Sequence, residues 1–114
     1  MATPYVPDRG DVVWLDFEPR AGHAQAGRWP ALVLSAAAYN ARSSLMVCCP
    51  VTSQVKGYPF EVPATSAAGS RVAGVVLADQ VQSLDWRQRN ASKMAAVTPQ
   101  CVLAVSAKIK LLIP

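Results

Sequence analysis

One residue of this chain is suited to acid–base chemistry near neutral pH, and it lies in a long segment between two expected strands. His23 is the single histidine, and so the one side chain whose ordinary pKa lies near neutrality. It falls within residues 20–28, which are mostly small, polar or glycine. At about nine residues this segment exceeds the ~2–5 residues of a usual hairpin connection, and long loops often carry function. We therefore predict a site in this loop, although a solvated loop histidine is also an ordinary occurrence.

A second candidate is a short basic segment later in the chain. Arg87 and Arg89 flank Gln88 directly after Trp86. The pair could contact phosphates, or pack on the indole by a cation–π interaction, and a solvated basic turn is the other interpretation. The whole chain carries 11 Lys and Arg against 7 Asp and Glu, a net charge of +4. This balance favours a polyanionic partner without identifying one.

Cysteine and histidine usage argues against a disulfide framework and a metal site. The three cysteines are odd in number, and the adjacent Cys48 and Cys49 would point to opposite faces of a strand. With one histidine and no Cys-x-x-Cys spacing, a structural zinc site lacks ligands. No apolar run approaches the ~18 residues of a membrane span, and the N-terminus has no apolar signal region. We expect a cytoplasmic protein with no metal and no membrane association.

The composition favours one mostly-β domain over residues 1–114. Fifteen valines against two isoleucines and nine leucines suit pleated surfaces better than helices. Thr98 and Pro99 predict the start of a C-terminal helix, as N-cap and first helical residue. Its apolar face would comprise Val102, Val105, Ile109 and Leu112. Trp14, on the first expected strand, is assigned to the core. Strands are expected at residues 11–17, 31–35, 45–51, 58–62 and 74–78, with a helical turn at 36–41.

These elements predict a small twisted β-barrel with one packed helix. Different short motifs are distributed along the chain, and together they carry a resemblance to a known family. They are Tyr5-Val6-Pro7-Asp8, Gly10-Asp11, Asp16-Phe17, Gln25-Ala26-Gly27, Pro30-Ala31, Val33-Leu34-Ser35, Tyr39-Asn40, the block from Lys56 to Val62, and Leu77-Ala78-Asp79-Gln80-Val81. Together they resemble the MazF/PemK family, the toxins of bacterial toxin–antitoxin modules. The block 56–62 is specific, whereas Gly10-Asp11 alone would mean little.

The resemblance implies an SH3-like barrel of the MazF/PemK/CcdB type that forms a homodimer. It implies a sequence-specific endoribonuclease that cleaves single-stranded RNA, including mRNA, and is neutralised by a cognate MazE-like antitoxin. Metal-free cleavage by the RNA's own 2′-hydroxyl needs a base, an acid and positive charge at the phosphate, but no cofactor. The products would be a 2′,3′-cyclic phosphate and a 5′-hydroxyl.

The resemblance also assigns catalytic residues. The family's loop arginine stands directly before the proline of strand two, where this chain has Trp29, and Arg28 lies one position earlier. A shift by one residue on an extended backbone turns a side chain to the opposite face. Arg28 is therefore either the phosphate-stabilising cation or a solvated loop charge. Thr52 matches the family's catalytic threonine, with a hydrogen bond to its own backbone as the alternative.

His23 and Asp79 match groups of the family's plasmid-encoded branch, whose partnering arginine aligns here with Leu77. Asp79 could equally be a turn residue that caps backbone amides. The glutamate that commonly precedes Gln25 is replaced by Ala24. The residues expected to contact RNA are Phe17, by stacking, with Gln25, Gln54, Lys56 and Arg87.

Two alternatives follow from these departures from the family pattern. The chain could be a catalytically weakened member that only binds RNA or antitoxin. It could also be a toxin that binds DNA gyrase, because the same barrel serves such proteins. A cleavage assay with single-stranded RNA in EDTA separates the enzyme from both.

Overall fold

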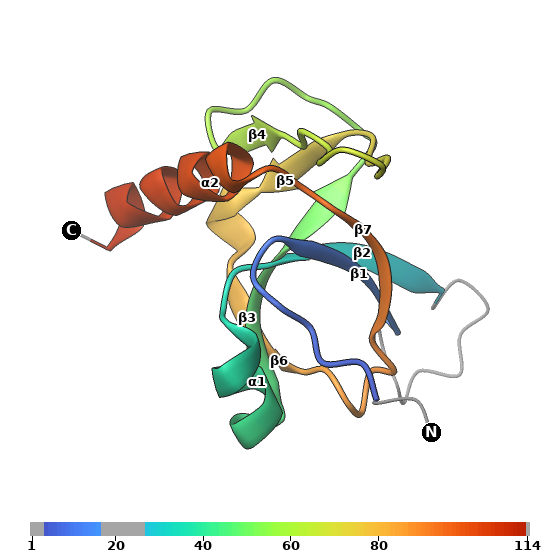
Figure 1. The fold of residues 1–114 in the computed structure, drawn as a ribbon. Helices are drawn as coiled ribbons and strands as arrows, with labels where there is room; N and C mark the ends of the chain where they lie inside the picture. The colour runs from blue at the N-terminus through green and yellow to red at the C-terminus, as the bar shows by residue number, and fades with distance from the viewer. Residues whose placement is uncertain (1–3, 17–26, 114) are drawn as a thin grey trace.

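The computed structural model describes residues 4–16 and 27–113 (Figure 1). Strands dominate this part of the chain, with one long helix at its end and two short helical segments. In chain order the elements are β1 (Asp11–Asp16), β2 (Arg28–Val33), α1 (Ala37–Ser43), β3 (Leu45–Thr52), β4 (Glu61–Pro63), β5 (Val75–Leu77), the 3-10 helix η1 (Ala78–Gln80), β6 (Gln82–Asp85), β7 (Ser92–Ala96) and α2 (Pro99–Leu112).

The strands form one antiparallel sheet in the order β4-β5-β3-β2-β1-β7. β3 is the longest strand, and it pairs with β6 along its first half and with β5 at its end. An isolated bridge between Ser66 and Val97 joins the segment after β4 to the end of β7. The two ends of the strand path therefore meet without a continuous ladder, and the sheet curls into a barrel-like form.

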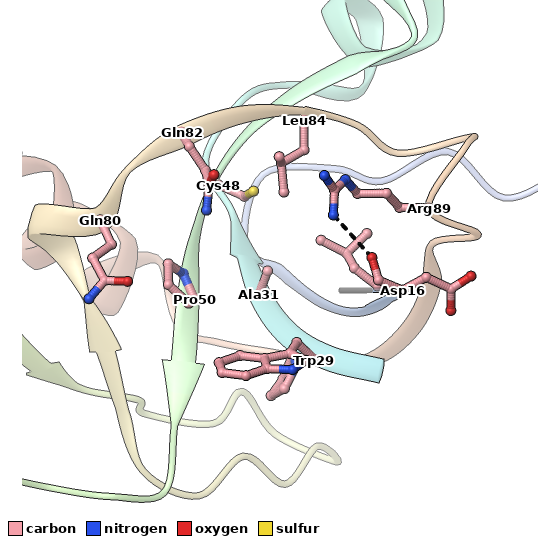
Figure 2. A pocket seen from close by; sticks show the side chains of 11 residues that line it. Asp16, Trp29, Ala31, Cys48, Pro50, Gln80, Gln82, Leu84 and Arg89 are labelled. Carbon is pink, nitrogen blue, oxygen red and sulfur yellow. Dashed lines mark hydrogen bonds between the residues drawn. The ribbon is translucent and has the colours of Figure 1, made fainter. Parts of the chain in front are cut away.

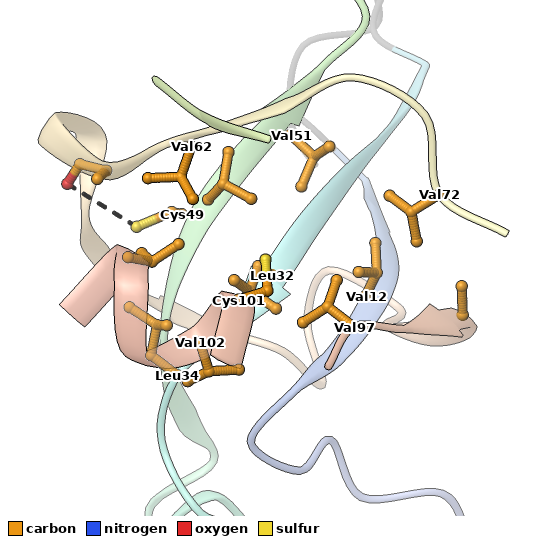
Figure 3. Packing of buried hydrophobic residues seen from close by; sticks show 14 residues of the cluster. Val12, Leu32, Leu34, Cys49, Val51, Val62, Val72, Val97, Cys101 and Val102 are labelled. Atoms are coloured by element: carbon orange, nitrogen blue, oxygen red, sulfur yellow. Dashed lines mark hydrogen bonds between the residues drawn. The ribbon is translucent and has the colours of Figure 1, made fainter. Parts of the chain in front are cut away.

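Both faces of the sheet are covered, because neighbouring residues of β1 are buried on opposite sides. Val12 packs in the larger apolar cluster, under α2, and Val13 packs in a second cluster with Trp86. Figure 3 shows the first cluster, in which Val102 and Cys101 of α2 lie against Leu32 and neighbouring strand residues. Both faces of the middle of the sheet therefore belong to the apolar core.

The C-terminal helix begins as the sequence predicts. Thr98 caps α2 through its hydroxyl, which accepts a hydrogen bond from the Cys101 amide at 3.2 Å, and Pro99 occupies the first turn. Val102 and Val105 are buried, whereas Leu112 is exposed. The reason is visible in Figure 1, where the last turns of α2 extend past the sheet.

The expectation of a mostly-β, barrel-like fold with a C-terminal helix is confirmed. Two details differ. The strand expected at 58–62 begins only at Glu61, because the backbone turns at 58–61, where the Glu61 amide donates to the Tyr58 carbonyl. The assignment of Trp14 to the core is wrong, since this residue is 36% exposed although it lies inside β1. No helix within residues 4–16 and 27–113 is long and apolar enough to cross a membrane.

Candidate active site

The ends of β1 and β2 meet at the foot of the predicted loop, where Arg28 lies opposite Asp16 in the strand register. The Arg28 Nη1 contacts the Asp16 Oδ1 at 2.6 Å, as a hydrogen bond and an ion pair. Its Nη2 lies within hydrogen-bond distance of the carbonyl oxygens of Trp14 and Asn90 and of the Ser92 hydroxyl. Arg28 is thus held in a fixed position while its side chain remains 37% exposed.

Asp16 is the centre of this exposed group, which we call the Asp16 network (Asp16, Arg28, Asn90 and Ser92). The Asn90 side-chain amide donates to the second carboxylate oxygen of Asp16 at 2.7 Å. This hydrogen bond, followed by the hydrogen bond and positive charge of Arg28, lowers the pKa of Asp16 below its ordinary value. Asp16 therefore stays ionised at neutral pH and positions Arg28, and it is poorly suited to act as a general base.

Thr52 ends β3, directly beside the first residue of β5. Its hydroxyl oxygen accepts a hydrogen bond from the Gln54 amide at 3.1 Å. This hydrogen bond is the local backbone contact that was named as the alternative to a catalytic role. It uses one lone pair of the Thr52 hydroxyl oxygen, so the hydroxyl proton can still be donated to another group. Gly74 packs against the Thr52 backbone with a positive φ, and any Cβ at that position would collide with the Thr52 carbonyl. The Thr52 position is consequently set by its neighbours.

One shallow pocket of about 380 Å³ brings Thr52 and Arg28 together. Trp14 and Trp29 form part of its wall. A cation fixed by a carboxylate and a hydroxyl with an available proton are groups that can bind a phosphate. The pocket contains two of the four predicted catalytic residues, and their catalytic roles remain predictions.

Trp29 borders the pocket of Arg28 and Thr52, and strand alternation directs its side chain toward the other face of β2. There it lines a second pocket, also of about 380 Å³, together with Ala31, Pro50, Gln80, Gln82 and Arg89 among others (Figure 2). The pocket lies across β2, β3 and β6 and continues to Arg89 in the turn before β7. A dashed line in Figure 2 marks the hydrogen bond from the Arg89 guanidinium to the Asp16 carbonyl.

Cys48 also lines this second pocket but is not a candidate nucleophile. Its side chain is buried, and burial raises the pKa of its thiol to about 12. The thiol is therefore neutral and shielded at physiological pH. Among the described residues, no group of three or more His, Cys, Asp or Glu side chains could hold a metal ion.

Asp79 is not brought to either pocket. It lies in η1 with an exposed side chain, and within the described part of the chain its carboxylate accepts no hydrogen bond. The described part of the chain therefore shows no hydrogen bond by which Asp79 caps a backbone amide. The catalytic role of Asp79 stays a prediction.

The predicted RNA-contacting residues that the structure describes lie in two places. Gln54 and Lys56 are exposed in the loop after β3, where the amides of Lys56 and Gly57 both donate to the Glu61 carboxylate. Arg87 instead stacks 4.3 Å from the centroid of the Trp86 ring and donates to the Ala41 carbonyl. This is the cation–π packing named as one possibility for Arg87. His23, Phe17 and Gln25 lie outside the described residues.

The Asp16 network and both tryptophans of the pockets are what sequence reasoning missed. Asp16 was part of a quoted motif, but its role depends on a strand register that places it opposite Arg28. Asn90 joins from the turn before β7 and Ser92 from the first position of β7, both more than 60 residues away from Arg28. The available signal was the alternation of β2, which already separates Arg28 from Trp29.

Comparisons with known proteins give a consistent result. The family model described as "PemK-like, MazF-like toxin of type II toxin-antitoxin system" matches residues 8–113. The chain is 48% identical over 113 residues, 99% of both chains, to the endoribonuclease toxin MazF of Escherichia coli K12. The crystal structure of MazF from Deinococcus radiodurans superposes with a TM-score of 0.82 at 55% identity, covering 96% of this chain and 98% of that one. A MazE–MazF crystal structure from the same organism gives a TM-score of 0.81 at 50% identity, covering 96% of this chain and 97% of that chain.

Proposed function

This chain belongs to the family of PemK-like, MazF-like toxins of type II toxin–antitoxin systems and is an endoribonuclease, and we propose that it cleaves single-stranded RNA by attack of the RNA's own 2′-hydroxyl. The observation that supports this chemistry most directly is the pocket shared by Arg28 and Thr52. It offers a fixed positive charge and a hydroxyl donor within one hollow, where the start of β2 lies near the end of β3.

In this mechanism the 2′-oxygen attacks the adjacent phosphorus as the bond to the 5′-oxygen breaks. The 2′-hydroxyl proton passes to a base, and the leaving 5′-oxygen takes a proton from an acid. Negative charge grows on the non-bridging phosphate oxygens, where Arg28 and the Thr52 hydroxyl would stabilise it. We assign the proton transfers to His23, with Asp79 as the second candidate. The products are a 2′,3′-cyclic phosphate and a 5′-hydroxyl.

Arg28 must share its charge between Asp16 and the phosphate in this account. The ion pair is partly exposed, so solvent screens its electrostatic attraction. Replacement of the Asp16 carboxylate by a phosphate oxygen as the partner of Arg28 therefore costs little free energy. The hydrogen bonds to backbone oxygens would keep the guanidinium in place during this exchange.

RNA binding outside the pocket is assigned to Phe17, Gln25, Gln54, Lys56 and Arg87. The exposed Lys56, on a loop that the Glu61 carboxylate holds in shape, suits a contact with the phosphate backbone. Single strands are preferred because in-line attack needs a backbone that can splay out of helical geometry.

The chain is also proposed to act as a single domain in a homodimer, in the cytoplasm, where mRNA is available. Its partner would be a MazE-like antitoxin, as in the MazE–MazF complex of the Deinococcus relative. A net charge of +4 makes the toxin open to a competing acidic segment.

The test is incubation of the purified protein with a long single-stranded RNA in excess EDTA. Discrete fragments that end in 2′,3′-cyclic phosphate and begin with 5′-hydroxyl are expected, and added antitoxin should suppress them. Intact RNA would contradict the proposal. Intact RNA that is nevertheless bound by the protein would instead indicate a member that has lost catalysis, an outcome that the engagement of Arg28 by Asp16 makes worth testing.

A further inference from the structure

The segment 53–60, between β3 and β4, is exposed along nearly its whole length and belongs to no helix or strand. Its hydrogen bonds nevertheless converge on one side chain, that of Glu61 at the start of β4. The amides of Lys56 and Gly57 donate to the two carboxylate oxygens of Glu61, at 3.1 and 2.9 Å. The Glu61 amide in turn donates to the Tyr58 carbonyl at 3.1 Å. One glutamate therefore closes the exposed segment into a ring of hydrogen bonds.

The backbone of the segment is shaped to hold this carboxylate, and its base is anchored. Gly57 has a φ of 82°, in the left-handed region, where successive amides can turn toward one anion. The Phe60 carbonyl accepts a hydrogen bond from the Ala78 amide of η1 at 3.0 Å, and the Lys108 ammonium of α2 lies 6.0 Å from the centroid of the Phe60 ring. Glu61 thus holds the exposed segment from a position that is itself fixed to the fold.

The ring of hydrogen bonds fixes the backbone of Lys56, the cation of this segment. The Lys56 side chain is exposed, and its ammonium lies 6.0 Å from the centroid of the Tyr58 ring. The segment starts directly after Thr52, whose hydroxyl accepts a hydrogen bond from the Gln54 amide. Lys56 is therefore carried on backbone that continues from the proposed site of cleavage.

The charge of Glu61 opposes RNA binding if charge alone decides. A carboxylate that accepts a hydrogen bond from the Lys56 amide lies near the proposed phosphate contact, and like charges repel each other. A favourable effect of Glu61 on RNA binding must therefore come from the geometry that it imposes on the segment. The two effects have opposite signs, so an experiment can tell them apart.

We propose that Glu61 is a positioning residue for RNA binding, which holds the segment 53–60 in the shape that presents Lys56 to the phosphate backbone. Its carboxylate then raises the affinity for a polyanion although the two carry charge of the same sign. The proposal rests on the proposed function for its ligand, RNA, and for the contact made by Lys56, but it does not require that the RNA be cut.

The test measures binding of a 5′-fluorescein-labelled 2′-O-methyl RNA nonamer, which cannot be cleaved, by fluorescence anisotropy between about 50 and 200 mM salt. The variants of the full chain are Glu61→Gln, Glu61→Ala, Lys56→Ala and the double variant of Glu61→Ala with Lys56→Ala. Glu61→Gln offers one amide of the segment an NH₂ donor in place of an acceptor. Asp8→Asn is the control of equal charge, because it removes an exposed carboxylate and keeps the oxygen that accepts from the Arg9 and Ala37 amides.

Glu61→Ala should weaken binding about fourfold at ~150 mM salt, and lower the slope of log affinity against log salt by about 0.7, as loss of one phosphate contact on a single strand does. Lys56→Ala should have the same effects, and the double variant should bind like Lys56→Ala, because the glutamate acts through the lysine. Glu61→Gln should also weaken binding, although it makes the chain more positive. Asp8→Asn should bind at least as tightly as wild type.

Unchanged or tighter binding by the Glu61 variants would overturn the proposal, and so would a further loss of affinity when Glu61→Ala is added to Lys56→Ala. Urea midpoints check that each variant is folded, and Glu61→Gln, which keeps the size of the side chain, decides the question if Glu61→Ala does not fold. Failure of the proposal is distinguishable from failure of the proposed function. RNA cleavage with no effect of Glu61 on binding removes the positioning role alone, whereas binding that depends on Glu61 without cleavage removes the enzyme alone.

Discussion

Two polar networks beyond opposite ends of β2 use similar hydrogen bonds in different surroundings. The first network lies after the C-terminal end of β2 and centres on Asn40 of α1, which is fully buried. The Asn40 side chain donates to the carbonyls of Pro7 and Ser35 and accepts from the Ser35 hydroxyl. The Asn40 carbonyl also accepts the indole N–H of Trp86. At the start of β2, the Asp16 network lies in contact with solvent.

The two networks differ in whether their hydrogen-bond partners can be replaced by water or by a ligand. A buried group that loses its partner has no water to replace it, so the Asn40 contacts contribute to the fold and are closed to ligands. An exposed ion pair contributes little to stability and can accept another anion. The chemistry of this protein is accordingly expected at the exposed network, and the following changes test that division.

Removal of the buried carboxamide should have the largest effect on the fold. We expect Asn40→Ala to lower the free energy of unfolding by about 3 kcal/mol, because it leaves buried backbone carbonyls without donors. Urea denaturation measures this effect, with Tyr39→Ala on the same helix as an exposed control. A loss below about 1 kcal/mol would mean that water replaces the side chain and that the network is not closed.

The buried thiols extend the same test to pH. Burial raises the pKa of Cys48 and of Cys49 to about 12, whereas an unfolded thiol ionises near pH ~8.5. The unfolded state therefore loses protons first, and stability should be constant below pH ~8.5 and fall above it, with a limiting slope of about 1.4 kcal/mol per pH unit for each thiol. Urea midpoints between pH 7 and 10 measure this fall. A flat profile would show that the thiols titrate normally in the folded protein.

Gly74 links the fold to the exposed site. Gly74→Ala should destabilise the protein by about 2 kcal/mol, because its φ is positive and the new methyl group would collide with the Thr52 carbonyl. RNA cleavage by the folded fraction should fall as well, since Thr52 must move. Gly69→Ala, which has a positive φ but open space, separates backbone strain from the collision. Equal effects of the two changes on cleavage would exclude the displacement of Thr52.

Thr52 itself should matter to the reaction and not to the fold. Thr52→Ala is expected to slow single-turnover cleavage at least tenfold, about 1.4 kcal/mol of transition-state stabilisation, while the urea midpoint stays nearly unchanged. Thr52→Ser keeps the hydroxyl and should recover most of the rate. A Thr52→Ala protein that cleaves at the wild-type rate would remove this hydroxyl from the mechanism.

The larger features of the molecule were predictable because they depend on local pattern. Alternating burial, the capping pair Thr98-Pro99 and the valine-rich runs carry their own signals. Trp14 was misassigned because its exposure depends on the pocket that it lines with Thr52 and Ala73, which come from distant parts of the chain. Sequence pattern does not encode that neighbourhood.

The site was predictable only in part for a similar reason. Resemblance to a family predicted Thr52 and Arg28 as catalytic candidates, and the structure places the two in one pocket, which Trp29 also lines. The partners of Arg28 come from two other strands and a turn, so no sequence window contains them. The second pocket likewise combines η1, β6 and the middle strands, and appears only once the sheet has curled.

The most direct test of the account compares two arginines that carry the same charge. Arg28 lies in the pocket with Thr52, whereas Arg87 is stacked on Trp86. Single-turnover RNA cleavage over a range of protein concentrations separates the saturating rate from the affinity. The account predicts that Arg28→Ala lowers the saturating rate at least about tenfold, as loss of a transition-state donor does, and that Arg87→Ala weakens affinity alone. A wild-type saturating rate for Arg28→Ala, or an equal loss of that rate for Arg87→Ala, would contradict it.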